Sequence, residues 1–386
     1  MLKYPIGIQS FEQIREDGYV YVDKTDLVYR LLTTGKIYFL SRPRRFGKSL
    51  LVSTLKNYFL GRKELFRGLA IESMEKEWAE YPVFHIDFNG SNFTEPGALD
   101  RKIEAMVSGW EDQYGSTGRY TGIGDRFVEV LRCAHERTGR RCVVLVDEYD
   151  KPLLDVLDTG YSIRVEGESR LLEDWNRDVL KGFYSVFKAA DADLQFVLLT
   201  GVTKFSQVSV FSGFNQPQDI SMDSRYDALC GITQEELEQY FSEPIDAMAA
   251  SYGESGAEML ARLKRQYDGY HFSEGMTDIY NPFSLLNTFA KQAFRNYWFA
   301  SGTPTYLLRL LSHTDENLDE LTGRYYSPEE FVDYKADVEK PLPMIYQSGY
   351  LTIKDYRSSR GTFLLDFPNN EVKSGFVSLA ASGYSK

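Results

Sequence analysis

Short, largely apolar runs alternate with stretches of helical periodicity over about the first two hundred residues. The apolar runs predict buried strands at 37–41, 83–88, 142–146 and 194–199. Between them, apolar residues recur every three or four positions, which predicts helices at 48–59, 98–113, 126–136 and 173–190. Apolar strands separated by helices indicate a parallel sheet covered on both faces. We therefore expect an α/β fold.

The pattern changes after Cys230. Thr233 is followed three residues later by Glu236, which is the capping-box signature of a helix start, and helical patterns then dominate to about Leu311. From residue 341 onward, MIYQSGYLTI and GTFLLDF are separated by a polar turn and predict a β-hairpin. We expect three regions: an α/β domain at 1–230, a helical region at 231–311 and a C-terminal region at 312–386.

Composition narrows the class of protein. The chain has 386 residues, of which 43% are hydrophobic and 26% charged, as in a folded globular protein. A net charge of -12 excludes a surface devoted to nucleic acid or anionic membrane, although residues 1–70 carry 13 Lys and Arg against 6 Asp and Glu. The three cysteines have no metal-ligand spacing, and no apolar run is long enough to span a membrane. We expect a cytoplasmic protein.

A basic loop, SRPRRFGKS, follows the first predicted strand at residues 41–49. Gly47, Lys48 and Ser49 form the ending of a P-loop, in which backbone N–H groups wrap phosphate, a lysine reaches the outer phosphates and a hydroxyl binds Mg²⁺. The full pattern GxxxxGK[ST] requires glycine at position 42, where this chain has Arg42. Taken alone, the tripeptide is equally compatible with a basic surface loop.

The strand at 142–146 runs directly into Asp147 and Glu148. In P-loop ATPases the acid at this place holds Mg²⁺ through water, and the next glutamate polarises the attacking water. A strand that simply ends in an acidic loop is the plainer alternative. Because the carboxyl ends of parallel strands share one rim, where open α/β folds bind ligands, the loop and the acidic pair together predict a site for ATP and Mg²⁺.

Other polar residues on this rim leave alternatives open. Thr200 either senses the γ-phosphate or begins a turn with Gly201. Arg44 and Arg45 either reach phosphate in cis, act on a neighbouring subunit as arginine fingers, or are solvated, which we expect of one of the two. Asp87 either positions water or, as we favour, is a loop carboxylate.

Two further groups of residues carry weaker signals. Residues 23–25 (Asp-Lys-Thr) either contact adenine or ribose, or supply an N-cap at Thr25 or Asp26 for a helix at 27–32. The aromatic residues at 267–272 and 297–298, together with His271, are expected to pack in the core rather than to stack on bases.

Taken together, these residues resemble the bacterial AAA-ATPase-like proteins, P-loop ATPases close to the archaeal-type ATPases with a winged helix. The resemblance covers nearly the whole chain, and its most specific motifs are RPRRFGKSL at 42–50 and VDEYDKPL at 146–153. The other motifs are PIG at 5–7, YVDKT at 21–25, TGVTKFSQVSVFSGFNQPQDIS at 200–221, YDGYHF at 267–272, YNPFSLL at 280–286, YW at 297–298, SGTP at 301–304 and QSGYLTI at 347–353.

The resemblance implies an ATP-binding core with an ASCE/AAA-like parallel sheet, a helical lid and a winged-helix-like C-terminal region. Its members include sequences in which arginine replaces the first P-loop glycine, so Arg42 is compatible with the family. Many members continue into a PD-(D/E)XK nuclease-like domain after a segment like FPNNEVKSGF, here at 367–376. We expect that this chain is either a shortened form or a longer chain that was cut.

The sequence thus predicts an Mg²⁺-dependent ATPase. Lys48, Glu148 and Thr200 are the catalytic candidates, and Ser49 and Asp147 are the metal ligands. The nucleotide would lie on Arg44, Arg45, Phe46, Gly47, Lys48, Ser49 and Leu50. The missing first glycine keeps open a nucleotide-binding switch or scaffold with little turnover, regulating a nuclease or binding DNA. DNA has weak support because residues 331–386 carry 7 Lys and Arg against 6 Asp and Glu. A homo-oligomer is a further candidate.

Overall fold

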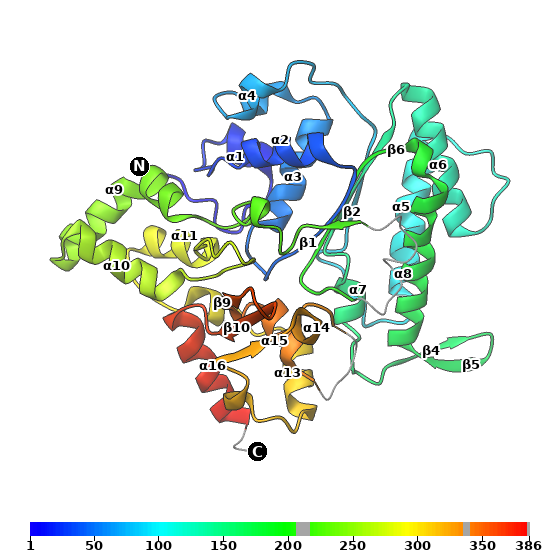
Figure 1. Cartoon of the computed structure of the whole chain (residues 1–386). Coiled ribbons are helices and arrows are strands. Elements are labelled where there is room, and N and C mark those ends of the chain that lie inside the picture. The colour runs from blue at the N-terminus through cyan, green and yellow to red at the C-terminus, as the bar shows by residue number, and fades with distance from the viewer. Residues whose placement is uncertain (206–216, 335–339, 384–386) are drawn as a thin grey trace.

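A five-stranded parallel sheet forms the centre of the chain (Figure 1). The computed structural model describes residues 1–205, 217–334 and 340–383, so part of the motif at 200–221 lies outside the described residues. The sheet has the order β2-β3-β6-β1-β7, and its strands are β1 (Ile37–Ser41), β2 (Val83–Asp87), β3 (Cys142–Asp147), β6 (Leu194–Gly201) and β7 (Gln218–Asp219). The four strands expected from the sequence are confirmed.

Alternate residues of β3 explain why the sheet is covered on both faces. Val144 and Val146 belong to the core formed with α5 (Ala98–Tyr114), α6 (Ile123–Thr138) and α8 (Leu172–Ala189). Val143 and Leu145 point to the opposite face, where they pack against α3 (Lys48–Phe59). Since side chains alternate along a strand, a run that is apolar throughout needs a cover on each side. Figure 1 shows α3 on one side of the sheet and the other three helices on the other.

The N-terminal residues pack beside α3. They form α1 (Phe11–Glu16), α2 (Thr25–Thr34) and α4 (Ile71–Met74), with a 3-10 turn η1 (Lys63–Phe66). The predicted N-cap at Thr25 or Asp26 was wrong, because α2 already includes Thr25 and its N-cap is Lys24. Oδ1 of Asp23 accepts the N–H of Thr25 at 2.8 Å, so the capping hydrogen bond comes from two residues earlier.

A short helix and a two-stranded hairpin follow β3 before α8 begins. After α7 (Lys151–Leu154), β4 (Ser162–Val165) and β5 (Glu168–Leu171) form a separate two-stranded hairpin that projects from the body in Figure 1. Its turn residues Glu166 and Gly167 both have positive φ angles, of 52° and 87°, as a two-residue type I′ turn requires. This hairpin was not expected from the sequence.

Helices dominate the next region, as expected. The capping box at Thr233 and Glu236 is confirmed. The helices are α9 (Gln234–Tyr252), α10 (Gly256–Tyr267), α11 (Pro282–Lys291), α12 (Tyr297–Ala300) and α13 (Thr305–His313). The core shared by α9, α10 and α11 also takes in Tyr4, Val20 and Val22 of the N-terminal segment. Trp298 of α12 and Leu307 and Leu310 of α13 belong instead to the large core that includes the sheet.

The C-terminal region mixes short helices with a small sheet. Its elements are β8 (Arg324–Tyr326), α14 (Pro328–Phe331), α15 (Leu342–Gln347), β9 (Thr352–Arg357), β10 (Thr362–Asp366) and α16 (Asn370–Gly383). The three strands are antiparallel in the order β8-β10-β9, which confirms the predicted hairpin at β9 and β10. The expected strand from Met344 was wrong, because Pro343 fits the first turn of a helix and cannot donate to a strand ladder.

Candidate functional site

The loop between β1 and α3 has the backbone of an anion-binding turn. Gly47 is the N-cap of α3 and has a φ of 95°, while Arg45 has a φ of 62°. Glycine has no side chain to cap the helix, so the first N–H groups of α3 are available to an anion at the positive end of the helix dipole. They border a cavity of about 410 Å³ whose lining includes Lys48, Ser49 and Glu148.

Lys48 is folded back onto its own loop. Its Nζ donates to the backbone carbonyls of Arg42 and Pro43, both at 2.9 Å, and the side chain is buried. Burial lowers the pKa of Lys48, while the carboxylates of Glu148, Asp150 and Asp147 act to raise it. The amine is therefore held within the loop, beside the acidic end of β3.

Asp147 lies between the neighbouring strands. Its Oδ1 accepts the Oγ1–H of Thr200 at 3.2 Å, and its Oδ2 accepts Nδ2 of Asn89 at 2.9 Å. Burial raises the pKa of Asp147, and a hydrogen bond with Ser49 acts to lower it. A hydroxyl and a carboxylate in contact at this rim are the hard oxygen donors that Mg²⁺ prefers, so these residues fit that ion.

Glu148 faces the same cavity through an unusual backbone conformation. Its φ of 53° turns the chain away from the line of β3, and its side chain lines the cavity together with Lys48. Burial raises the pKa of Glu148, and the charge of Lys48 acts to lower it. Two residues later, the buried Asp150 accepts the N–H groups of Val202 at 3.0 Å and Thr203 at 2.7 Å, which fixes the end of β6 against this loop.

Thr200 is an interior residue of the site. It lies within β6 and is fully buried, so the alternative in which it begins a turn is wrong. Its hydroxyl donates to the Val146 carbonyl and to Asp147, both at 3.2 Å. Asp87 also ends its strand here, because the register of β2 on β3 sets it opposite Asp147.

The three loop arginines have different environments. Arg42 is 2% exposed; it donates to the carbonyls of Ser221 and Tyr226 and stacks 4.0 Å from the Phe272 ring. Arg44 donates to the Trp298 carbonyl at 3.1 Å and to the Ser301 hydroxyl at 2.5 Å, both in the helical region. Arg45 is exposed and lines the cavity.

Phe46 and the aromatic motifs belong to the core. The Phe46 side chain is fully buried and meets the rings of Tyr270 and Phe272 edge to face. His271 is hydrogen-bonded at both ring nitrogens, to Asp278 and to the Ile353 carbonyl, which confirms its structural role. Only the backbone of Phe46 is therefore free to contribute to anion binding.

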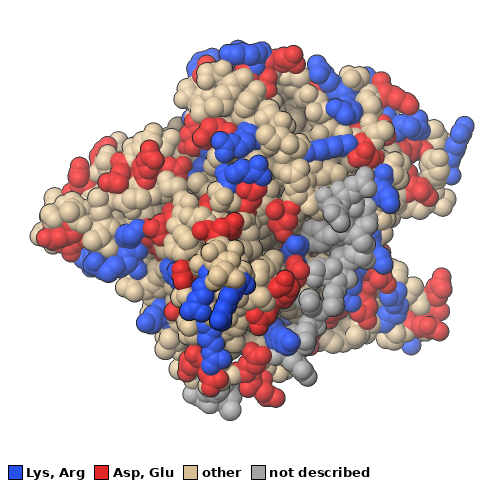
Figure 2. Space-filling model, viewed as in Figure 1, with Lys and Arg blue, Asp and Glu red and all other residues tan. Residues whose placement is uncertain are grey.

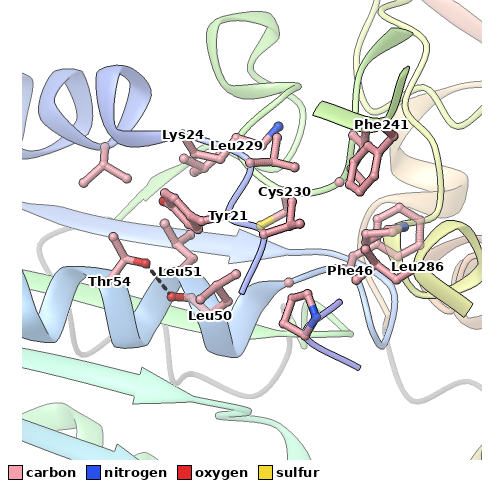
Figure 3. Close-up of a pocket in the computed structure, with 18 residues that line it drawn as sticks. Tyr21, Lys24, Phe46, Leu50, Leu51, Thr54, Leu229, Cys230, Phe241 and Leu286 are labelled. Atoms are coloured by element: carbon pink, nitrogen blue, oxygen red, sulfur yellow. Dashed lines mark hydrogen bonds between the residues drawn. The ribbon is translucent and has the colours of Figure 1, made fainter. Parts of the chain in front are cut away.

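A second, mainly apolar cavity of about 100 Å³ adjoins the start of α3 (Figure 3). Lys24 lines it and pairs with Glu236 at 2.6 Å, whereas Asp23 is bonded to Thr25 and Ala70 outside it. The other labelled lining residues are Tyr21, Phe46, Leu50, Leu51, Thr54, Leu229, Cys230, Phe241 and Leu286. The N-terminal segment and the helical region thus close the two sides of this cavity.

Sequence reasoning missed Asn89 and the role of Trp298. No site role was predicted for Asn89, yet its side-chain amide donates to both Asp87 and Asp147. Trp298 was expected in the core and is buried. Its indole N–H also donates to the Arg44 carbonyl in the loop at residues 41–49, which we call the phosphate loop. A signal for Asn89 was available, since it follows a rim strand by two residues, whereas nothing local marks Trp298.

The comparisons with known proteins agree with this architecture. A family profile described as "Predicted AAA-ATPase" matches residues 5–211. An uncharacterised protein in the vnfD 5′ region of Azotobacter chroococcum mcd 1 is 39% identical over 379 residues, covering 96% of this chain and 68% of that protein. The Aeropyrum pernix ORC1 protein, solved in complex with DNA, matches over 93% of both chains with 12% identity and a TM-score of 0.29.

The fold and the site define the class of protein. A parallel sheet in which β6 separates the phosphate-loop strand β1 from the acidic strand β3, with the loop running into α3, is the P-loop NTPase fold of the ASCE type. The profile spans more than half of the chain, and this chain belongs to the family of predicted AAA-ATPases. No helix within the described residues is long and apolar enough to cross a membrane.

Proposed function

We propose that the chain binds ATP with Mg²⁺ on the loop at residues 44–50 and hydrolyses it to ADP and phosphate. The observation that carries the proposal is that Lys48, Ser49 and Glu148 line one cavity. Asp147 joins them at the same rim through its hydrogen bond with Ser49. When ATP binds, Lys48 would exchange its hydrogen bonds to the Arg42 and Pro43 carbonyls for contacts with the outer phosphates. Its position as the first residue of α3 suits this role. The apolar cavity beside Lys24 is of the kind that takes an adenine base.

Each side chain has a distinct chemical task in this proposal. Ser49 and Asp147 would hold Mg²⁺, which when bound supplies positive charge against the phosphates. Glu148 accepts a proton from the attacking water, a role favoured by burial that raises its pKa towards neutrality. Thr200 donates to Asp147 and keeps that carboxylate oriented.

Calorimetric titration with ATP and Mg²⁺ tests the binding step. Lys48→Ala should lose ATP binding by a factor of about 100 or more, because the only lysine on the loop is removed. Lys56→Ala, two turns along the same helix, is the matched control and should bind as the wild type does. Equal affinity in the Lys48→Ala and wild-type proteins would remove the basis of the proposal.

A regulatory switch with little turnover is a second candidate, favoured by the contacts of the buried Arg42. That arginine stands where the P-loop pattern has its first glycine. It donates to the Tyr226 carbonyl and stacks on Phe272 in the segment between α10 and α11, so nucleotide binding would be coupled to that segment. Steady-state phosphate release separates the two functions. Release that depends on Glu148 supports the ATPase, whereas binding without release supports the switch.

The C-terminal region supports a further proposal, that it is winged-helix-like and contacts DNA. Counted from α13, the element order of helix, strand, two helices and a hairpin, with sheet order β8-β10-β9, is consistent with that fold. Figure 2 shows positive side chains over the hairpin, but charges of both signs are interspersed across this face. Binding of a fluorescent duplex that weakens steeply with salt would support DNA contact, and salt-independent or absent binding would exclude it.

A further inference from the structure

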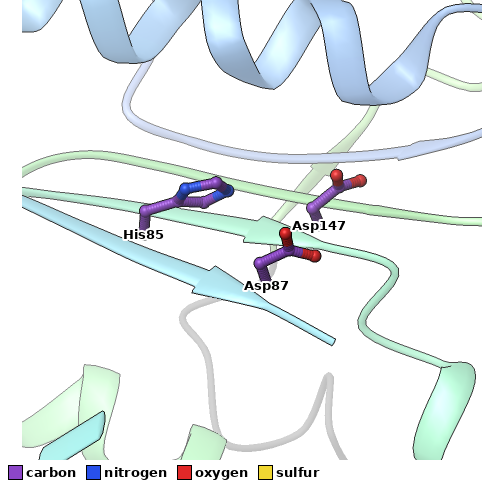
Figure 4. Close-up of side chains that lie close together, drawn as sticks. All are labelled: His85, Asp87 and Asp147. Atoms are coloured by element: carbon purple, nitrogen blue, oxygen red, sulfur yellow. The ribbon is translucent and has the colours of Figure 1, made fainter. Parts of the chain in front are cut away.

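A histidine and two aspartates meet on the rim, on the β2 side of Asp147. One ligand atom from each of His85, Asp87 and Asp147 lies within 4.8 Å of the other two. Asp87 pairs with Asp147 in the parallel register, and His85 is two residues earlier on β2, so it shares the face of Asp87. Figure 4 shows all three side chains on that face, with the imidazole directed towards the carboxylates.

His85 differs from the other histidines of the chain. All four lie within the described residues, and His135, His271 and His313 each bond an aspartate through a ring nitrogen. The buried Nε2 of His85 has no hydrogen-bond partner in the described part of the chain. An imidazole nitrogen that is buried without a hydrogen-bond partner and lies beside two carboxylates is available to bind a metal ion.

We propose that His85, Asp87 and Asp147 bind a divalent transition-metal ion of the Mn²⁺ or Zn²⁺ class. Three protein ligands leave open positions for water, as in catalytic metal sites. An imidazole nitrogen among the ligands favours these ions over Mg²⁺, which prefers oxygen donors throughout. The site is additional to the proposed Mg²⁺–ATP site, requires no nucleotide and shares Asp147 with it.

Asn89 is not a proposed metal ligand, but its side-chain amide binds both ligand carboxylates. Its Nδ2 donates to Oδ1 of Asp87 and Oδ2 of Asp147, each at 2.9 Å, which holds the two carboxylates at a fixed separation. Oδ1 of Asp87 also accepts the backbone N–H of Asn89, at 2.8 Å, so Oδ2 of Asp87 is the oxygen left to bind a metal. Such orienting hydrogen bonds are typical of metal ligands. The charged groups that act on the ring are Asp87 and Asp147 and, with the opposite sign, Lys56.

Electron paramagnetic resonance of Mn²⁺ tests this site on the full chain, without nucleotide and after removal of bound metal with EDTA. The wild-type protein should bind one Mn²⁺ at this site with an affinity that His85→Gln and Asp87→Asn each weaken by about tenfold or more. The control variant Arg45→Ala, which changes an exposed residue of the nucleotide loop, should bind Mn²⁺ within about twofold of the wild type. Ser49→Ala removes a hydrogen bond to the shared ligand Asp147 and should weaken Mn²⁺ binding less than His85→Gln does. His135→Gln controls for surface histidines.

The outcomes separate this site from the proposed ATPase site. Absence of Mn²⁺ binding to the wild type at millimolar concentrations would overturn the metal site, as would unchanged binding in both His85→Gln and Asp87→Asn. Loss of binding in Ser49→Ala with retention in His85→Gln would assign the ion to the nucleotide loop and equally overturn it. Thermal melting identifies a variant that fails to fold, and the other variant then decides. ATP titration of Lys48→Ala reports on the nucleotide site independently.

Discussion

Trp298 and the phosphate-loop residue Arg44 each donate a side-chain hydrogen bond to the backbone carbonyl of the other. Nε1 of Trp298 donates to the Arg44 carbonyl at 3.0 Å, and the Arg44 guanidinium donates to the Trp298 carbonyl at 3.1 Å and lies 4.4 Å from the ring centroid. The N–H of Trp298 in turn donates to Oε2 of the buried Glu371 on α16, at 2.9 Å. One tryptophan therefore links the phosphate loop to the C-terminal helix.

Trp298→Phe should weaken ATP binding without unfolding the protein. The change keeps most of the buried aromatic ring but removes the indole donor, so the Arg44 carbonyl loses its partner at a cost of about 1 kcal/mol in stability. We expect ATP affinity to fall by about three- to tenfold in calorimetry. Trp175→Phe is the matched control, since Trp175 also donates through Nε1, to Asp100 at 2.9 Å. Equal losses of affinity in both variants would contradict a specific link to the loop.

Thr200→Val should separate hydrolysis from binding. The two side chains have the same shape, but valine lacks the hydroxyl that donates to Asp147. We expect phosphate release to slow by about tenfold while ATP affinity is retained. Thr203→Val is the control, because the buried Thr203 hydroxyl lies 3.7 Å from the sulfur of Met344, away from Asp147. An unchanged rate in Thr200→Val would show that the hydroxyl has no part in catalysis.

Gly349→Ala should disturb the phosphate loop from the C-terminal region. Gly349 has a φ of 90°, and an added Cβ would lie 2.7 Å from Cβ of Pro43 in the loop. We expect a loss of roughly 2 to 4 kcal/mol in the free energy of unfolding and weaker ATP binding. Gly361→Ala in the β9–β10 turn shares the positive φ, at 62°, but meets no atom within 4 Å, and it should cost only about 1 kcal/mol. Denaturant titrations that give equal costs would contradict the steric argument.

Glu371 should make stability depend on pH. Burial raises its pKa to about 7, although hydrogen bonds from Ser284, Phe299 and Trp298 act to lower it. An unfolded glutamate titrates near pH 4.3, so between these values the folded chain binds the extra proton. The Glu371 contribution is therefore present at low pH and is lost as the pH rises to about 7. Relative to Glu371→Gln, the wild type should lose roughly 3 kcal/mol of unfolding free energy across this range. Parallel pH curves would contradict this.

Much of the sheet could be predicted because the residues within each strand are enough to mark it as a buried strand. The runs that became β1, β3 and β6 are largely apolar, and buried parallel strands leave little choice of residue. The segment from Met344 was misread because its apolar residues were joined to those of the strand that follows, as one run from 344 to 353. There the prolines at 341 and 343, which suit a helix start, outweighed the pattern.

The site was only partly predictable because several of its contacts join distant segments. Lys48, Ser49 and Asp147 belong to motifs with recognisable spacing, and they do meet at one rim. The partner of Arg44 is 254 residues away, and nothing in the local sequence of Trp298 indicates that distance. That Asp87 lies beside Asp147 could not be predicted, because it depends on the register of β2 on β3, and the pattern of apolar residues in a strand does not specify register.

Phosphate release from ATP by the Glu148→Gln variant tests the proposed ATPase most directly. The change keeps the size of the side chain but removes the carboxylate that accepts the proton from water. We expect ATP binding equal to the wild type and a rate reduced by about 100-fold or more, whereas Glu168→Gln on the exposed β4–β5 hairpin should leave the rate unchanged. Wild-type rates in Glu148→Gln, or no release by the wild type in the presence of Mg²⁺, would contradict the account.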